Sequence, residues 1–494
     1  MRTKHCFLGI DLGTSALKLT LIDEDLKLVA RESQPYEIDQ PEFGWREIEP
    51  DVWFQCLAQA MERLFQAQDP ARVDGIGVTG QMHTLVMLDE RGAPLRPALM
   101  WDDARTRELV AEMRGEIARQ PGGDYLARTI STGSPAANLY WLRRAEPERF
   151  KRLAKFLIAP DYLVYRLTGK YGTDYCEAST SCLYDIERRE WSPYMREMIG
   201  LDPSVYPDVR GSAVAAGRLL PEIARRFSMR EDVEVLTGTG DNPATALSTG
   251  CLGQGIPVIS LGTSGVLMTR VDHLEPDAKG KSILFSADGV RFSHLVQGAL
   301  QSNGTSFEWW LQSILGIEDF SQADRMLEER PPKASKLLFF PHLTGEKTVF
   351  ADPDIRGAFL GLSTQTTRED MIYAVLEGLS YGYRQLAEAM RLDLTGCGRI
   401  RIVGGGARSS SWAQALANVL NVTVEQMDGI VSPALGIALL AAYARGFIPS
   451  LEAIAGGTIK VKRSFRPEPD EVRRCEEMYP KYLRIFQAMK FIYD

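Results

Sequence analysis

The tetrapeptide Leu12-Gly13-Thr14-Ser15 occurs again as Leu261-Gly262-Thr263-Ser264, 249 positions later in a chain of 494 residues. Each copy is preceded and followed by a short apolar run, which predicts a β-hairpin with the glycine and the hydroxyl residues at its tip. Backbone N–H groups and hydroxyls at such a tip are suited to holding phosphate oxygens. The repeat therefore predicts two similar domains that face one nucleotide. A chance match is the alternative, because turns of this composition are common.

Chain length and charge limit the class of protein. A chain of 494 residues exceeds the size at which a single core stops growing, so we expect two domains, 1–246 and 247–494. The composition, 45% apolar and 25% charged, is ordinary for a globular enzyme. Acidic residues exceed basic ones by 65 to 57, which argues against nucleic acid or an anionic membrane surface as the main partner.

Several features predict a cytoplasmic protein. The seven cysteines are scattered without a Cys-x-x-Cys pair, as in a protein with reduced thiols, and the five scattered histidines argue against structural zinc. The N-terminus lacks the apolar stretch and cleavage site of a signal peptide. The most apolar window, 434–444, is too short to span a bilayer.

Strand and helix patterns alternate along both halves, which predicts the α/β class with covered sheet faces. We expect strands at 7–13, 16–22, 26–31, 73–78, 233–237 and 400–403, and helices at 50–66 and 368–389. Residues 137–169 read as helical throughout, with Gly169 as a cap, and 174–191 read as a polar loop.

Two glycine motifs are rejected as nucleotide sites. Gly75-Ile-Gly77-Val-Thr-Gly80 has the letters of a dinucleotide fingerprint, but the residues that follow predict loop and strand, and the fingerprint needs a helix. Gly280-Lys281-Ser282 resembles the end of a phosphate-binding loop, but Glu275 stands where that loop requires glycine.

Polar residues cluster where two predicted strands end. Gln81-Met82-His83 follows one strand, and Trp101-Asp102-Asp103-Ala104-Arg105 follows another. A sugar or polyol needs fixed donors and acceptors beside an aromatic wall, so these stretches are candidate sugar contacts. A histidine in such a place is otherwise an ordinary loop residue.

Asp241 is the candidate catalytic carboxylate. It lies in Gly238-Thr239-Gly240-Asp241-Asn242, where small neighbours let a ligand approach, and a helix expected from Pro243 aims its positive dipole at the same spot. Asp11 precedes the first hairpin tip. The alternative for Asp241 is that it only caps the helix.

A third glycine-rich stretch, Gly404-Gly405-Gly406-Ala407-Arg408-Ser409-Ser410, joins a strand to a helix. Close backbone approach at these glycines would seat an adenosine or its phosphates. Tight packing between strand and helix is the alternative.

Taken together, these motifs resemble the FGGY-type carbohydrate kinases, members of the actin-like ATPase superfamily. The resemblance runs from end to end and rests on Gly9-Ile-Asp-Leu-Gly-Thr-Ser15, Gly80-Gln-Met-His83, Trp101-x-Asp-x-Arg105, Gly240-Asp-Asn242, Ser260-Leu-Gly-Thr-Ser-Gly265, Gly345-Glu346, Gly404-Gly-Gly-Ala-Arg408 and the pattern between Gly357 and Glu377.

The resemblance implies two actin-like (ribonuclease H-like) ATPase domains flanking a central cleft, the first binding mainly sugar and the second mainly ATP with Mg²⁺. It implies that Asp241 is the general base and that Asp11 helps to hold the metal, with Asp241 as a second metal contact. The sugar contacts would be Gln81, Met82, His83, Trp101, Asp103, Asp241 and Asn242. The nucleotide contacts would be Thr14, Ser15, Gly262, Thr263, Gly405, Gly406 and Ser410.

D-Xylulose is the expected sugar, and another ketopentose, a pentitol or a sugar acid is the alternative. A homodimer would be typical of the resemblance. The chain departs from the family pattern at Thr84, where glycine is usual, at Asn138, where lysine is expected, and at Lys347-Thr348-Val349. A sugar sensor without turnover is a rival, but it would not need the base Asp241. The interpretation as a dinucleotide-dependent oxidoreductase is supported only by the rejected glycine motif at 75–80.

Overall fold

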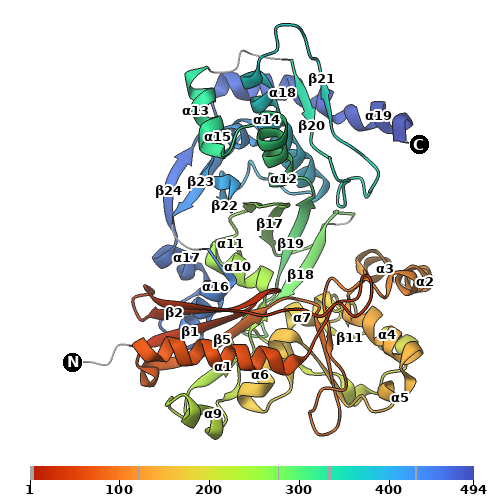
Figure 1. The fold of residues 1–494 in the computed structure, drawn as a ribbon, viewed down its shortest axis with the longest axis vertical. Coiled ribbons are helices and arrows are strands. Elements are labelled where there is room, and N and C mark those ends of the chain that lie inside the picture. The colour runs from red at the N-terminus through yellow and green to blue at the C-terminus, as the bar shows by residue number, and fades with distance from the viewer. Residues whose placement is uncertain (1–4, 121–122, 276, 331–335, 429–430, 494) are drawn as a thin grey trace. The chain divides into compact units, whose positions relative to one another are not determined.

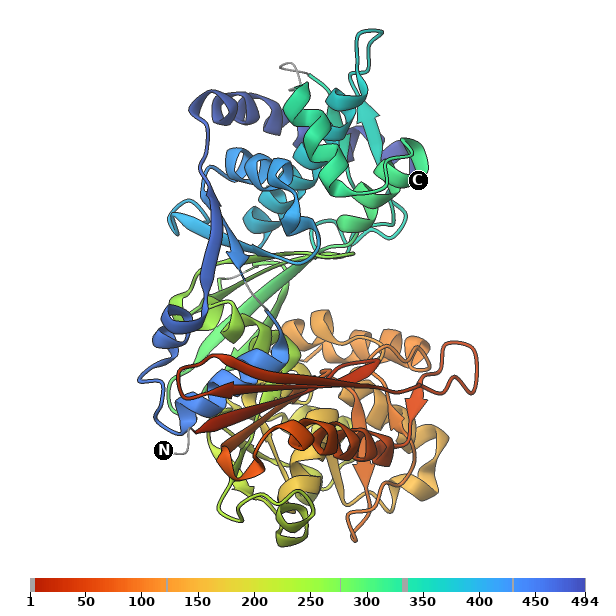
Figure 2. The same ribbon diagram turned by 60° about the vertical axis from the view of Figure 1, so that its left-hand side comes forward.

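The computed structural model describes residues 5–120, 123–275, 277–330, 336–428 and 431–493. The chain divides into two compact units, whose elements are labelled in Figure 1 and seen from a second direction in Figure 2. Unit 1 comprises Met1–Gly253, Ile283–His294 and Ile430–Thr458. Unit 2 comprises Gln254–Ser282, Leu295–Gly429 and Ile459–Asp494.

The main sheet of unit 1 is built around β1, which is antiparallel to β2 and parallel to β5. Its strand order is β13-β14-β5-β1-β2-β3, with β15 paired to the end of β5. Every residue of β1 and β5 is buried, because helices cover both faces of the sheet. The bounds are β1 Cys6–Leu12, β2 Ala16–Asp23, β3 Leu28–Pro35, β5 Val73–Gly80, β13 Ala215–Arg218, β14 Glu234–Leu236 and β15 Thr239–Gly240.

Helices from distant parts of the chain cover this sheet. α1 (Pro50–Ala67) packs on one face, and α16 (Pro433–Ala444) packs on the other against β1 and β5 (Figure 1). A Cβ atom on Gly77 would lie 2.5 Å from the backbone oxygen of Ile437 in α16. The glycines of the rejected dinucleotide motif therefore allow a helix to pack closely. The next element after them is a strand, β6 (Leu85–Leu88), which confirms that rejection.

A smaller sheet, in the order β4-β7-β6-β8, adjoins the main one in unit 1. Its strand β8 (Lys155–Ile158) corrects the prediction of continuous helix over 137–169, because its apolar run pairs antiparallel with β6. The stretch 174–191 is also more ordered than expected, since Asp174 caps a helix there. The bounds are β4 Glu47–Ile48, β7 Ala98–Leu99, α2 Arg107–Ile117, α3 Asp124–Thr129, α4 Pro135–Ala145, α5 Pro147–Phe150, α6 Ala159–Thr168, α7 Tyr175–Thr180, β10 Tyr184–Asp185 and β11 Glu190–Trp191.

The second large sheet, whose central strands lie in unit 2, repeats the strand order of the first. It runs β18-β19-β17-β16-β22-β23-β24, so that the central β16 has an antiparallel neighbour, β17, on one side and the parallel strands β22 and β23 on the other. In both units the hairpin that contains the repeated tetrapeptide begins with this central strand. The bounds are β16 Val258–Leu261, β17 Gly265–Val271, β18 Lys281–Phe285, β19 Ser293–Leu300, β22 Arg399–Val403, β23 Thr423–Asp428 and β24 Lys460–Phe465. The predicted α/β class with two similar units is confirmed.

The core of unit 2 forms between this sheet and two helices, α14 (Arg368–Ala389) and α15 (Ser410–Leu420). Trp412 is fully buried in that core. Among the described residues, no helix has the length and apolar character needed to cross a membrane. The remaining bounds are β9 Gly172–Asp174, α8 Pro193–Ile199, β12 Asp208–Arg210, α9 Pro221–Arg226, α10 Asp241–Ser248, α11 Cys251–Gln254, α12 Gly304–Glu308, the π-helical turn Trp309–Ile314, α13 Phe320–Glu329, β20 Leu338–Phe340, β21 Ala358–Leu360, α17 Leu451–Thr458, α18 Pro469–Leu483 and α19 Ile485–Tyr493.

The compact units do not coincide with a single cut of the chain. Residues 430–458 belong to unit 1, because α16 packs on β1, β2, β5 and α10. The expected ranges 1–246 and 247–494 therefore describe the two repeats of the sequence, and the assignment of sugar to the first and ATP to the second stays a prediction.

Candidate active site

Three neighbouring strand ends gather the candidate residues of unit 1. β1 and β15 both run parallel to β5, and their registers pair Asp11 with Thr79 and Gly240 with Gly80. Asp11, Gln81 and Asp241 therefore emerge together at the carboxyl edge of the sheet, where α/β proteins bind ligands. Asp11 and Asp241 are 230 positions apart in the sequence, and only the sheet brings them together.

The pKa values of both carboxyl groups, Asp241 and Asp11, are raised. Burial raises the pKa of Asp241 to about 7, with the charge of Asp11 as the second cause, while the backbone N–H of Asn242 opposes the shift. Burial also raises the pKa of Asp11 to about 6, against the attraction of Lys18. Asp241 is the first residue of α10 and Gly240 occupies the N-cap position, so Asp241 is not the capping residue of this helix. A carboxylate with a pKa near neutrality is suited to accept a proton.

The two carboxylates fit a magnesium ion that is held mainly by its phosphate ligand. Atom Oδ1 of Asp11 is buried and has no hydrogen-bond partner among the described residues. Within the same residues, no group of three or more histidine, cysteine or acidic side chains forms a complete metal cage. Mg²⁺ usually keeps several waters and takes one or two protein carboxylates together with phosphate oxygens, so this donor set suits it.

The stretch Gln81-Met82-His83 continues from β5. The backbone N–H of Gln81 donates to the Leu12 oxygen at 2.9 Å, which ties the stretch to β1. Met82 is 6% exposed and packs against Gly240, where an added Cβ would lie 2.6 Å from Cγ of Met82. His83 has a left-handed backbone with φ of 69°. The structure thus brings these predicted sugar contacts beside Asp241.

Trp101 connects two parts of the site. Its indole Nε1 donates to Thr14 Oγ1 at 3.1 Å, and its backbone N–H donates to Thr84 Oγ1 at the same distance. Trp101 is 44% exposed. Thr84, which departs from the family pattern, is fully buried and accepts the backbone hydrogen bond from Trp101.

Asp103 is engaged inside the protein. Its carboxylate accepts hydrogen bonds from the backbone N–H of Arg46 at 2.6 Å and from Arg105 at 2.8 Å, and it is fully buried. The guanidinium of Arg105 lies 3.8 Å from the centre of the Trp45 ring and also pairs with Glu47. These contacts favour a supporting role for Asp103 behind the sugar contacts.

The other residues that depart from the family pattern are hydrogen-bonded or packed inside the protein. Asn138 lies in α4, fully buried, and its Nδ2 donates to the Gly133 oxygen at 3.3 Å. In unit 2, Val349 packs against the core, and Thr348 Oγ1 donates to the Ala299 oxygen at 3.1 Å. Both positions are therefore part of the packing of their own unit.

In unit 2 the second hairpin tip meets the glycine triplet. β16 and β22 are parallel neighbours, with Ser260 opposite Val403, so their ends lie side by side. A Cβ atom on Gly404 would be 3.3 Å from the backbone nitrogen of Gly262. Gly405 has open space where a side chain would stand. The predicted nucleotide contacts Gly262, Thr263, Gly405 and Gly406 therefore come together in the fold.

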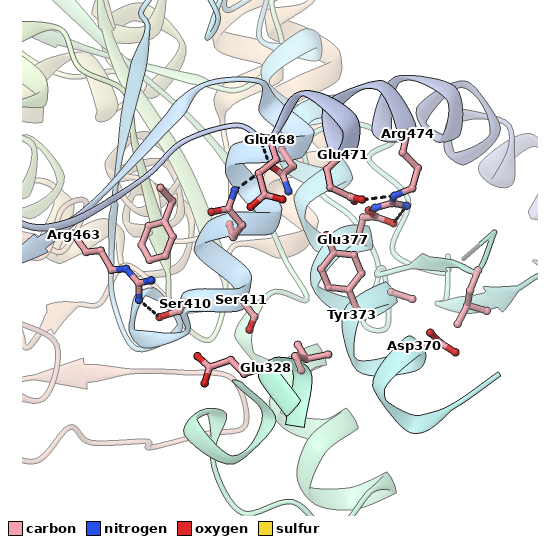
Figure 3. A pocket seen from close by; sticks show the side chains of 16 residues that line it. Glu328, Asp370, Tyr373, Glu377, Ser410, Ser411, Arg463, Glu468, Glu471 and Arg474 are labelled. Carbon is pink, nitrogen blue, oxygen red and sulfur yellow. Dashed lines mark hydrogen bonds and ion pairs between the residues drawn. The ribbon is translucent and has the colours of Figure 1, made fainter. Parts of the chain in front are cut away.

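Ser410 follows the glycine triplet and is the first residue of α15. It lines a cavity of about 440 Å³ between α13, α14, α15 and α18, and its Oγ accepts a hydrogen bond from Arg463 at 3.0 Å (Figure 3). Its backbone N–H donates to Asp324 at 2.8 Å. Carboxylates such as Glu328 and Glu468 outnumber the arginines around this cavity, which makes it a poor place for phosphates.

Sequence reasoning missed Glu177, which lies beside the site on α7. It is 1% exposed, and an added Cβ on Gly240 would lie 2.9 Å from its Oε1. The residue falls in the stretch that was expected to be loop. The sequence offered no signal for it, because the burial of its neighbours Cys176 and Ala178 is visible only in the structure.

Comparison with known families identifies both halves of the chain. Residues 6–248 match the N-terminal domain of the FGGY family of carbohydrate kinases. Residues 258–445 match the C-terminal domain of the same family. The two matches cover both hairpins and the stretches that contain Asp241 and the glycine triplet.

Individual proteins are similar over the full length. The xylulose kinase of Bacillus subtilis is 32% identical over 492 residues, which cover 98% of this chain and 97% of that protein. A crystal structure described as a xyloylose kinase from Brucella ovis is 32% identical, with a TM-score of 0.87 over 99% of this chain and 100% of that one. A xylulose kinase structure from Rhodospirillum rubrum shares the fold at 24% identity, with a TM-score of 0.89 over 99% of this chain and 100% of that one.

Proposed function

The chain belongs to the FGGY family of carbohydrate kinases, and we propose from this premise that it transfers the γ-phosphoryl group of ATP to D-xylulose, giving D-xylulose 5-phosphate. The observation that carries the proposal is the pair Asp11 and Asp241 at adjoining strand ends, with the pKa of Asp241 raised to about 7. A sensor without turnover would not need a base there.

Asp241 acts as the general base in this proposal. It accepts the proton of the sugar hydroxyl as the hydroxyl oxygen attacks the γ-phosphorus, and the bond from that phosphorus to the bridging oxygen of ADP breaks. Gln81, Met82, His83 and Asn242 orient the sugar, and Trp101 forms its aromatic wall. Asp103 is buried and pairs with Arg105, so it supports the loop that follows Trp101.

The phosphates would be held by the backbone of the hairpin tips and the glycine triplet. In unit 2 these are Gly262, Thr263, Gly405 and Gly406, and in unit 1 they are Thr14 and Ser15. A bound Mg²⁺ would neutralise charge that develops on the transferred group, with Asp11 and Asp241 as its protein ligands. Ser410 is retained as a candidate adenosine contact only, given the acidic cavity that it lines.

The test is ADP release from Mg-ATP across ketopentoses, pentitols, gluconate and glycerol, with native protein and Asp241→Asn in parallel. We expect D-xylulose to give the highest kcat/KM and the variant to lose at least about 10³-fold in kcat. Preference for another sugar would correct the substrate. ATP binding without sugar-dependent turnover in the native chain would refute the kinase reaction and favour the sensor.

We also propose that the protein is located in the cytoplasm and forms a homodimer. The absence of a membrane-spanning helix among the described residues is compatible with that location. Cell fractionation and analytical ultracentrifugation would test the two statements separately.

A further inference from the structure

Tyr36 is bound at two points to the tip of the first hairpin. It directly follows β3, whose last residue, Pro35, lies opposite Ala16 of β2, so Tyr36 reaches the tip between β1 and β2. Its backbone N–H donates to the Ser15 oxygen at 3.1 Å. Its side-chain hydroxyl donates to the backbone oxygen of Gly13. The ring is thereby held against the turn that contains the repeated tetrapeptide.

The same hydroxyl is in contact with Gln81, a predicted sugar contact. The side-chain nitrogen Nε2 of Gln81 donates to the Tyr36 hydroxyl oxygen at 3.4 Å. The backbone N–H of Gln81 donates to the Leu12 oxygen at 2.9 Å. Because Leu12 and Gly13 are consecutive, these bonds close a ring that contains the hairpin tip, Tyr36 and Gln81.

The direction of each bond in this ring follows from what each group can donate. A backbone carbonyl can only accept, so the Tyr36 hydroxyl gives its one proton to Gly13. Burial raises the pKa of this hydroxyl, so it keeps that proton at neutral pH. The hydroxyl oxygen can then only accept from Gln81, and only the amide nitrogen has protons to give. The side-chain oxygen Oε1 of Gln81 is therefore turned away from Tyr36.

Oε1 of Gln81 is a buried acceptor at the carboxyl edge of the main sheet of unit 1. Gln81 is 2% exposed, and its Oε1 has no hydrogen-bond partner among the described residues. Asp11 and Asp241 emerge at the same edge. A buried oxygen of this kind destabilises a protein unless a ligand supplies the donor. A sugar hydroxyl is such a donor.

We propose that Tyr36 is a positioning residue, which fixes the Gln81 side-chain amide so that its oxygen accepts a hydrogen bond from a hydroxyl of the sugar. Tyr36 touches no substrate and acts through Gln81. The contact with the sugar rests on the proposed function, whereas the orientation of the amide does not.

Tyr36→Phe tests this role, because phenylalanine keeps the ring and leaves the Gln81 amide free to turn. Tyr194→Phe is the matched control in unit 1, since the buried hydroxyl of Tyr194 has no hydrogen-bond partner among the described residues. We expect Tyr36→Phe to raise the KM for the sugar at least ~10-fold and Tyr194→Phe to stay within about twofold of native. An unchanged sugar KM in Tyr36→Phe would overturn the proposal.

A Gln81→Ala background separates this role from a general effect on the hairpin. The amide that Tyr36 orients is then missing, so Tyr36→Phe should change the sugar KM by less than about threefold. An effect on the KM for ATP through Gly13 would remain in that background. The same change of the sugar KM with and without Gln81 would mean that Tyr36 acts through the hairpin alone, and the proposal would be wrong.

Gln81→Glu is the second variant, for the case in which Tyr36→Phe does not fold. A carboxylate keeps an oxygen for the sugar but has no N–H for the Tyr36 hydroxyl. We expect the sugar KM to rise at least ~10-fold in this variant. A native KM would contradict the need for the bond between Gln81 and Tyr36.

The side-chain amide of Gln81 gives a readout that needs no activity. Its NMR signals in protein labelled with ¹⁵N-glutamine are identified by their loss in Gln81→Ala. Without substrates, these amide protons should exchange with solvent at least ~10-fold faster in Tyr36→Phe than in native protein or Tyr194→Phe. Unchanged exchange would refute the bond. If native protein phosphorylates no sugar, the proposed function fails, but this measurement still decides whether Tyr36 holds the amide.

Discussion

Burial, and after it the charge of Asp11, raises the pKa of Asp241, although 229 residues separate the two carboxylates in the chain, because β1 and β15 both flank β5. The pKa of Asp241 rises from 3.8 to about 7. The folded protein therefore binds this proton more tightly than the unfolded chain between about pH 4 and 7. Asp241 thus lowers stability as the pH rises through that window.

Asp241→Asn should for this reason be more stable than native protein at pH 8, by roughly 1–3 kcal/mol, and equally stable at pH 4. Thermal unfolding with EDTA at both pH values measures the difference. Asp232→Asn is the control, because the side chain of Asp232 is 65% exposed. A variant that is less stable than native protein at pH 8 would show that the fold does not raise the pKa of the Asp241 carboxyl group.

His342 should weaken unit 2 in acid. It is 1% exposed between the rings of Phe340 and Phe350, neither ring nitrogen has a hydrogen-bond partner among the described residues, and burial lowers its pKa to about 3. The unfolded chain takes up the proton below about pH 6.5, so stability is lost as the pH falls.

His342→Phe removes the titrating group and keeps a ring. Native protein should lose about 2 kcal/mol more than this variant between pH 6.5 and 5, where the unfolded histidine becomes charged. Urea unfolding at the two pH values gives both numbers. Identical pH dependence in the two proteins would contradict the neutral, buried state of His342.

Arg474 should make a large contribution to the free energy of unfolding of unit 2. It pairs with Glu377, which is 3% exposed, and with Glu471 beside the cavity in Figure 3. Arg474→Ala leaves the Glu377 carboxylate buried and unpaired, which costs about 3–5 kcal/mol. Arg473→Ala is the neighbouring control, because its side chain is 70% exposed and its ion pair contributes about 1 kcal/mol or less. Similar melting temperatures for the two variants would be incompatible with this difference.

Thr84 should set the affinity for sugar through Trp101. Thr84→Val keeps the shape but leaves the Trp101 N–H without its acceptor, which costs about 1–3 kcal/mol. We expect the KM for sugar to rise ~5-fold or more, with Thr84→Ser close to native because its hydroxyl is retained. Steady-state kinetics with the three proteins decide this. An unchanged KM in Thr84→Val would mean that the hydroxyl does not position the indole.

Long, strongly patterned elements were predictable from the sequence. The helix at 368–389 has the predicted bounds, because its apolar stripe is continuous and Thr367 and Asp370 cap its first turn. β8 was missed because its four residues are held by pairing with β6, and that partner is distant in sequence. α7 was missed for a similar reason, since a six-residue helix owes its stability to packing.

The sequence alone determined the two repeated hairpins, the α/β class and the family, because glycine-hydroxyl turns and apolar runs are local patterns. It also supplied Asp11, Asp241 and the glycine triplet as candidates. Only the tertiary structure decided which of them meet. Strand pairing puts Asp11 and Asp241 at one edge of the sheet, and packing places Glu177 beside Gly240. The pKa of Asp241 and these contacts depend on neighbours that are distant in the chain, which local patterns do not reveal.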